Sequence, residues 1–517
     1  MKNFIKKNRQ LFLLIILSIA FFSATLTITW DGAHYLSYVD IFEGNKAFYT
    51  WDIVRGPVFP IFIYLGDKIF GKSAIGILSL FFIVYLLYCF IIEKISNEIF
   101  DDIKFKKIFK FLFFTFAIFN PVVFGYFHTL LTEILAIFLM VLSCYFAYKW
   151  VDAGGKKEKI FYSLFFMFLI PFSYFLKQPY ICIAFFPLVF SSLFSFLRNF
   201  SKMDLLYRFG TLVAGFILLI SFSSFWNNFL YNHGADMNSG RDSSSMLTGQ
   251  LFASISNVRT VKINNYKKIS SDKLLSKKEK LDAKRYLKKK KSVMLIKIYY
   301  NKKDLEHDIV YLDNKDKSSV VSNMVEISKI FVKHPATLID SYGSNYCALS
   351  SLCVIDTNDG VGYWVSDKID FDNLFENSTI GYRTFSNLEN IFYLSDEKYD
   401  SAKYYYQQTS YSITSKLIYS LANITNKLYK LSIILLPVIL IIGFIIRILN
   451  RKYIRYYSLY RFGMIFGLSS FFTLLSCSFV GQIIDRYSVY CFITSLICFI
   501  SILIFIIKNI KVRSDSV

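Results

Sequence analysis

The chain has 517 residues, of which 54% are hydrophobic and 19% aromatic, with 56 Phe but only 8 Pro. Soluble globular domains contain about 45–50% apolar residues, and a mean hydropathy of +0.42 excludes both a soluble and a disordered protein. Eight Cys in this length are too few for a disulfide scaffold. On so apolar a chain, the net charge of +22 indicates membrane topology rather than binding to nucleic acid.

Ten apolar runs along the chain have nearly the length of a membrane-spanning helix. Such a helix needs about 20 apolar residues to cross the hydrocarbon core. The runs cover approximately residues 10–29, 74–92, 108–127, 130–149, 160–176, 179–197, 209–229, 431–448, 462–482 and 488–507. We therefore predict a mainly α, polytopic membrane protein with about ten transmembrane helices.

The stretch 230–430 contains no adequate span and is predicted to form a domain outside the bilayer, α or α+β in class. It separates an N-terminal membrane domain, 1–229, from a C-terminal membrane segment, 431–517. The first part holds seven spans and the last part three. Within the exposed domain we expect helices from about Ser271 and over about 318–333, and a Tyr-rich helix over 399–430 that leads into the eighth span.

Lys and Arg near the ends of the predicted spans fall mainly on one side of the membrane. That side carries 24 of them, whereas the short segments on the opposite side carry 6. Because basic residues are retained on the cytoplasmic side, we predict cytoplasmic termini and an extracytoplasmic domain 230–430, in a multi-pass protein of the plasma or inner membrane. The first apolar run is longer than the usual core of a signal peptide, about 7–15 residues, so an uncleaved anchor is favoured.

Few ionisable side chains lie at membrane level, and all of them fall on the predicted outer side. Because such groups are costly in the bilayer, they are functional candidates. They are Asp31, Arg55, Asp67, Glu133, Lys177, Asp485 and Arg486. The first outer loop, 30–73, carries three of them and is predicted to lie on the membrane as interfacial helices. A site at the outer membrane interface is therefore expected.

Five short motifs resemble the GT-C superfamily of polytopic glycosyltransferases, in the branch of the protein O-mannosyltransferases and the aminoarabinose transferase of lipid A. Their order relative to the spans carries the resemblance, which is stronger over the first seven spans. The motifs are WDGAHY at 30–35, RGPVFPIFIYLGDKIFG at 55–71, LLTE at 130–133, LKQP at 176–179 and DRY at 485–487. Two positions depart from the family: Gly32 replaces a second acidic residue, and Lys177 replaces the usual Arg.

The resemblance implies transfer of a sugar from a polyprenyl-phosphate donor, with inversion, to a lipid, glycan or protein acceptor on the outer face. Such chemistry needs a carboxylate that accepts the hydroxyl proton and cations that hold the phosphate. We expect Asp31 to be the general base and Arg55, Lys177 and Arg486 to bind the phosphate. Each also has a simpler interpretation, because Asp31 can cap a helix and cations at span ends often reach towards the headgroups.

Glu133 is the second expected catalytic residue, because it can orient the acceptor or pair with a cation. Its simpler interpretation is a carboxylate favoured at the start of a helix. His34, Tyr35, His128 and Tyr487 are expected to line the acceptor or donor pocket.

The sequence predicts no metal site, because its five His are scattered, although some members of the family use a divalent cation. The isolated pair Cys347 and Cys353 leaves a disulfide open.

Two other classes of protein fit the same topology. A membrane polymerase of lipid-linked oligosaccharide repeats would depend on Arg in its outer loops rather than on Asp31. A transporter or flippase would make no bond and would carry inverted repeats with broken helices, which the sequence does not display.

The run Lys277–Lys303 carries 12 basic residues; it is either a solvated helix or a contact with anionic lipid headgroups or glycan.

Overall fold

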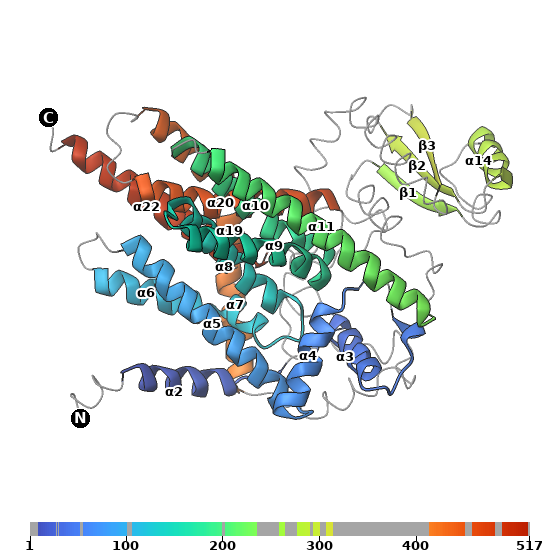
Figure 1. The fold of residues 1–517 in the computed structure, drawn as a ribbon, viewed down its shortest axis with the longest axis horizontal. Coiled ribbons are helices and arrows are strands. Elements are labelled where there is room, and N and C mark those ends of the chain that lie inside the picture. Colours follow the sequence, from blue (N-terminus) through green and yellow to red (C-terminus); the bar gives the residue numbers. More distant parts are fainter. Residues whose placement is uncertain are drawn as a thin grey trace.

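The computed structural model describes residues 9–26, 28, 30–51, 55–100, 106–198, 202–234, 258–263, 277–289, 293–299, 307–313, 413–449, 457–480 and 489–514. These residues are mostly helical, as predicted, and the longest helices lie side by side in one bundle (Figure 1). Figure 1 also shows that α2 begins and α22 ends at the same end of the bundle, whereas the small sheet lies beyond the other end.

Eight of the described helical segments are long and apolar enough to cross a membrane. They match the second to ninth predicted spans. The helices concerned are α5 (Ala74–Phe100), α6 (Lys106–Ile118) with α7 (Pro121–Tyr126), α8 (Glu133–Asp152), α9 (Lys156–Leu176), η2 (Gln178–Tyr180) with α10 (Ile181–Arg198), α11 (Lys202–Asn232), α19 (Ile413–Leu449) and α20 (Tyr457–Val480). The first and tenth predicted spans correspond to shorter apolar segments of α2 (Arg9–Phe22) and α22 (Phe492–Ser514).

The third span is broken into two helices at an Asn-Pro pair. Pro121 is the first residue of α7, and the side chain of Asn120 accepts hydrogen bonds from the backbone N–H groups of Val122 and Val123. Two buried tyrosines of α5 donate to carbonyl oxygens at the end of α6: Tyr85 to that of Ile118 and Tyr88 to that of Ala117. Inside a membrane no water can satisfy such groups, so these side chains stabilise the break.

The fourth span starts later than predicted, at Glu133 rather than near residue 130. Residues 127–132 form a turn between α7 and α8, because the Thr129 hydroxyl and several backbone N–H groups there donate to carbonyl oxygens a few residues earlier. Glu133 is consequently the first residue of α8, and His128 does not lie on the same helix.

Two buried arginines hold the C-terminal end of α8. Arg208 of α11 donates from Nη2 to the carbonyl oxygen of Trp150, 2.9 Å away, and from Nη1 to the hydroxyl of Ser191. Its guanidinium also lies 4.5 Å from the centre of the Trp150 ring. Arg461 of α20 pairs with Asp152, the last residue of α8. Cations at a helix C-terminus satisfy its unpaired carbonyl groups.

The segment 30–73, for which we keep the name first outer loop without implying a side of the membrane, is helical, as predicted. It contains α3 (Trp30–Phe42), the 3-10 turn η1 (Phe48–Thr50) and α4 (Val58–Phe70). One face of α4 is buried, including Phe59 and Ile63. The opposite face exposes large apolar side chains at every fourth position, Ile61, Leu65 and Ile69. An exposed apolar face of this kind fits contact with lipid.

The described residues between the seventh and eighth spans include a three-stranded antiparallel sheet in the order β1-β2-β3. The strands are β1 (Val258–Ile263), β2 (Val293–Tyr299) and β3 (His307–Asp313). Val258 pairs with Ile298, and Val293 pairs with Asp313. Helix α14 (Lys277–Lys289) covers part of the helix expected from Ser271, and α19 begins at Ile413 within the expected range 399–430; the helix expected over 318–333 lies outside the described residues.

Candidate functional site

Glu133 and Lys177 form an ion pair between two neighbouring spans. The ammonium Nζ of Lys177 lies 3.8 Å from Oε1 of Glu133. The Glu133 side chain is fully buried, whereas that of Lys177 is 17% exposed. Lys177 follows the last residue of α9, and Glu133 is the first residue of α8. The distance exceeds that of a direct hydrogen bond, so the contact is an ion pair without a direct hydrogen bond.

Two glycines bring the first outer loop against these helix ends. A Cβ added to Gly32 would lie 2.7 Å from the carbonyl oxygen of Leu130, three residues before Glu133. A Cβ added to Gly56 would lie 1.8 Å from the carbonyl oxygen of Phe175, two residues before Lys177. Only glycine permits such approaches of backbone to backbone. Asp31, in the first turn of α3, and Arg55 are therefore next to residues that touch the two helix ends.

Arg55 is held in the loop by aromatic side chains. Its guanidinium lies 5.3 Å from the ring centre of Tyr35, which is within the range of a cation–π contact. Tyr35 is buried and packs edge to face against Phe59 of α4. The indole N–H of Trp51 donates to the carbonyl oxygen of Arg55, 2.9 Å away. Tyr35 thus contacts an expected phosphate ligand, and Trp51 is a further contact that was not predicted.

A series of side-chain contacts extends from Glu133 to the C-terminal spans. Thr132 donates to Oε2 of Glu133, and its hydroxyl oxygen also lies 3.3 Å from the hydroxyl of Tyr180. The ring of Tyr180 packs edge to face on Tyr490, whose hydroxyl contacts the thiol of Cys477. Sequence reasoning did not single out Tyr180 and Tyr490. The available signal was that Tyr180 follows directly on Leu176–Pro179 of the quoted motif.

The two histidines of the predicted pocket have different surroundings. His34 is partly exposed in α3, and its carbonyl oxygen accepts a hydrogen bond from the hydroxyl of Ser37. His128 is buried, with its ring nitrogens 2.8 Å from the carbonyl oxygens of Phe124 and Phe21. Burial lowers the pKa of His128, and the two carbonyl contacts offset this only in part. His128 therefore ties α2 to α7.

Several predicted residues lie outside the described part of the chain. They are Asp485, Arg486, Tyr487, Cys347 and Cys353. Tyr490 follows the DRY motif by three residues and is described. Its ring packs on that of Tyr180.

Acidic and basic side chains clamp the first outer loop to the start of α5. Lys72 lies 2.7 Å from Glu43 and 3.7 Å from Asp40, and Lys46 lies 3.2 Å from Asp40. Desolvation lowers the pKa of Lys72, but the hydrogen bond to Glu43 and the nearby carboxylates outweigh it, so the pKa is raised. These contacts fix the end of α3 relative to α4.

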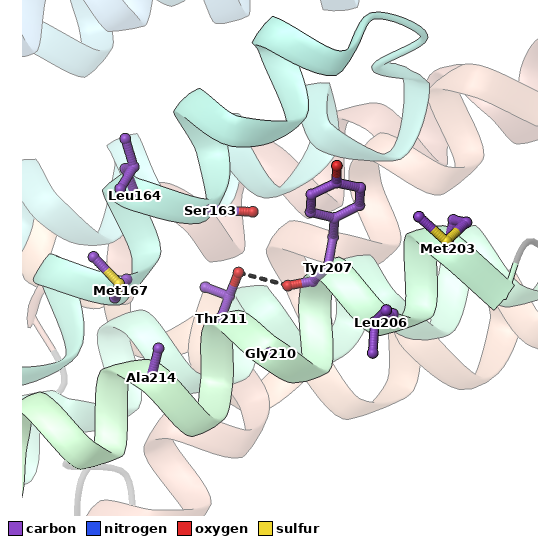
Figure 2. A pocket seen from close by; sticks show the side chains of 9 residues that line it. All are labelled: Ser163, Leu164, Met167, Met203, Leu206, Tyr207, Gly210, Thr211 and Ala214. Carbon is purple, nitrogen blue, oxygen red and sulfur yellow. Dashed lines mark hydrogen bonds between the residues drawn. The ribbon is translucent and has the colours of Figure 1, made fainter.

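A groove of about 420 Å³ lies between α9 and α11 (Figure 2). Its lining is almost entirely apolar, and Thr211 turns its hydroxyl to the carbonyl oxygen of Tyr207. The lining residues are Ser163, Leu164, Met167, Met203, Leu206, Tyr207, Gly210, Thr211 and Ala214. The groove opens beside exposed apolar side chains of two spans, so it faces lipid and offers no charged group for chemistry.

Among the described residues, no group of three or more His, Cys, Asp or Glu is arranged to hold a metal ion. Comparison with protein-family models, with curated proteins and with solved structures finds no match to this chain. What the fold defines is a polytopic helical membrane protein with an ion pair and hydroxyl groups buried where the first outer loop meets two spans.

Proposed function

We propose that the protein is a membrane glycosyltransferase that moves a sugar from a polyprenyl-phosphate donor to an acceptor on the outer face of the plasma or inner membrane. One observation supports this most strongly. Gly32 and Gly56, which follow Asp31 and Arg55, lie against the helix ends that carry Glu133 and Lys177. Four of the motifs on which the resemblance rests therefore converge at one end of the bundle.

In the proposed reaction the acceptor hydroxyl attacks C1 of the sugar. A bond forms between the hydroxyl oxygen and C1, the bond from C1 to the phosphate oxygen breaks, and polyprenyl phosphate leaves. The hydroxyl proton passes to the carboxylate of Asp31, which acts as general base. Attack opposite the leaving phosphate inverts the configuration at C1.

Cations are needed where negative charge collects on the leaving phosphate. Arg55, Lys177 and Arg486 are the proposed ligands, because Arg offers paired donors and Lys a compact charge. The ion pair of Lys177 with Glu133 supports this role for Lys177, since the buried carboxylate holds the ammonium at the end of α9. In the proposal Glu133 also orients the acceptor, while the residues between the seventh and eighth spans face the cell exterior.

The decisive experiment replaces Asp31 by Asn in membranes supplied with a labelled polyprenyl-phosphate sugar. We expect sugar transfer to fall by at least 100-fold, because general-base catalysis contributes about 10²–10⁴-fold. Glu43→Gln serves as the control, since Glu43 lies in the same loop and its carboxylate binds Lys72 and Asn45 beyond the end of α3. Transfer at a near wild-type rate by an intact Asp31→Asn protein would remove Asp31 as the base.

The same membranes distinguish the other classes of protein. Elongation of a lipid-linked oligosaccharide without release of polyprenyl phosphate from a monosaccharide donor would identify a polymerase. Movement of a lipid-linked substrate across the bilayer with no new bond would identify a transporter. Either result would overturn the proposed function.

A further inference from the structure

Tyr180 lies beside the Glu133–Lys177 pair. It is fully buried, at the end of the 3-10 turn η2 that follows Lys177. Its hydroxyl is 3.3 Å from the hydroxyl of Thr132, and the Lys177 ammonium is 5.8 Å from the centre of its ring. One side chain therefore contacts the cation directly and reaches the carboxylate through one hydroxyl group.

The direction of this hydrogen-bond chain follows from the number of protons available. Thr132 has one hydroxyl proton, and it donates that proton to Oε2 of Glu133. An ionised carboxylate only accepts. The hydroxyl of Tyr180 must then be the donor to Thr132, so the chain runs from Tyr180 through Thr132 to Glu133. Hydrogen bonds aligned in this way strengthen one another.

The C-terminal spans hold Tyr180 from the opposite side. The Tyr490 ring packs on it edge to face, with ring centres 5.2 Å apart. Tyr490 is itself fully buried, and its hydroxyl lies 3.1 Å from the thiol of Cys477 in α20. Tyr180 is consequently fixed by the N-terminal and C-terminal membrane parts together.

We propose that Tyr180 is a positioning residue: its ring holds the Lys177 ammonium for the phosphate of a polyprenyl-phosphate donor, and its hydroxyl holds Glu133 for the acceptor. This inference rests on the proposed function and deepens it. The two roles belong to different atoms of Tyr180, so two substitutions separate them. Tyr180→Phe removes the hydroxyl and keeps the ring, whereas Tyr180→Leu removes both.

The expected kinetics differ between these variants. Tyr180→Phe lowers kcat several-fold and leaves the KM for the donor within about twofold, because the cation–π contact is kept. Tyr180→Leu also raises the donor KM by about 10-fold, which is the scale of a partly desolvated cation–π contact. A role in packing alone would lower the amount of folded protein without separating KM from kcat.

Thr132 provides the matched controls. Thr132→Val interrupts the chain and is expected to lower kcat as Tyr180→Phe does, with no further loss in the double variant. Thr132→Ser keeps the hydroxyl and is expected to restore near wild-type kinetics. Additive losses in the double variant would show that the two hydroxyl groups act separately, and would overturn the hydroxyl part of the proposal.

Equilibrium binding of labelled polyprenyl phosphate, which carries no sugar, tests the ring without any turnover. Weaker binding to Tyr180→Leu than to Tyr180→Phe is the expected result, and equal binding overturns the inference even if the protein transfers sugar. If the expected binding difference is found but no donor supports transfer, the proposed function fails while the phosphate site stands. A wild-type protein that binds no polyprenyl phosphate overturns both.

Discussion

Gly56 lies so close to Phe175 that a single added carbon would overlap the carbonyl oxygen of the latter, at 1.8 Å. The contact joins the first outer loop to the last turn of α9, beside Arg55 and Lys177. We expect Gly56→Ala to force the loop away from α9, at a cost of about 1–3 kcal/mol as in other overpacked sites, and to lower sugar transfer. Thermal unfolding in detergent and transfer assays measure the two effects. Gly154→Ala is the control, since nothing lies within 4 Å of a Cβ there.

Lys177→Met is expected to destabilise the protein, because it leaves the buried carboxylate of Glu133 without its cation. Breaking a buried pair costs about 3–5 kcal/mol. The double variant Glu133→Gln with Lys177→Met should recover much of this loss, which a double-mutant cycle of unfolding free energies measures. Lys159→Met, at the partly exposed pair with Asp204, should cost less than about 1 kcal/mol. Equal losses of unfolding free energy at the two sites would contradict the inference that burial makes the Glu133–Lys177 pair more important for stability.

The stability of the protein is expected to fall as the pH drops below about 6.5, through His128. Its pKa is lowered in the folded state, chiefly by burial. The unfolded chain therefore binds a proton at His128 more readily than the folded protein does. The stabilisation by neutral His128 is complete above the pKa of the unfolded chain, about 6.5, and is lost as the pH falls below it. Unfolding midpoints at pH 8 and pH 5.5 test this. His128→Gln should flatten the dependence, whereas His233→Gln, at an exposed histidine, should leave it unchanged.

Arg208→Lys is expected to destabilise the bundle by about 1.5–3 kcal/mol, the scale of hydrogen bonds to a charged group. A lysine cannot donate to both Ser191 and the Trp150 carbonyl while stacking on the Trp150 ring. The measurement is again the unfolding midpoint. Arg285→Lys, at an exposed arginine of α14, is the comparison for a change of the same kind outside this contact, and an equal loss there would contradict the assignment.

Lys288→Cys is expected to react with an impermeant thiol reagent added to intact cells, because α14 belongs to the part proposed to face the exterior. Lys157→Cys lies at the start of α9 and should react only after the membrane is opened. Both side chains are exposed, so access alone decides the result. The opposite labelling pattern would invert the proposed topology.

The positions of most spans could be predicted from the sequence, because apolar runs of fixed length are set by the thickness of the bilayer. The break at Asn120 and the late start of α8 at Glu133 were missed, since the apolar run continues through both. The break is stabilised by hydrogen bonds from Tyr85 and Tyr88, more than 25 residues away in the sequence, and the late start of α8 by local bonds such as that of the Thr129 hydroxyl.

The candidate site could be predicted in part. Charged residues such as Glu133 and Lys177 stand out in apolar sequence, and the structure pairs them. Tyr180 did not stand out, because one Tyr among 37 carries no signal until its neighbours are known. The same is true of Gly56, whose importance lies in the distance to Phe175.

The two helices that lead to and from the residues between the seventh and eighth spans are much longer than a membrane crossing requires. α11 has 31 residues and α19 has 37, which correspond to roughly 46 and 55 Å against about 30 Å of hydrocarbon. Each helix is continuous beyond the length of a span, so a displacement of its far end would tilt the span itself. Pro437 removes one backbone hydrogen bond from α19, so α19 bends more easily than α11.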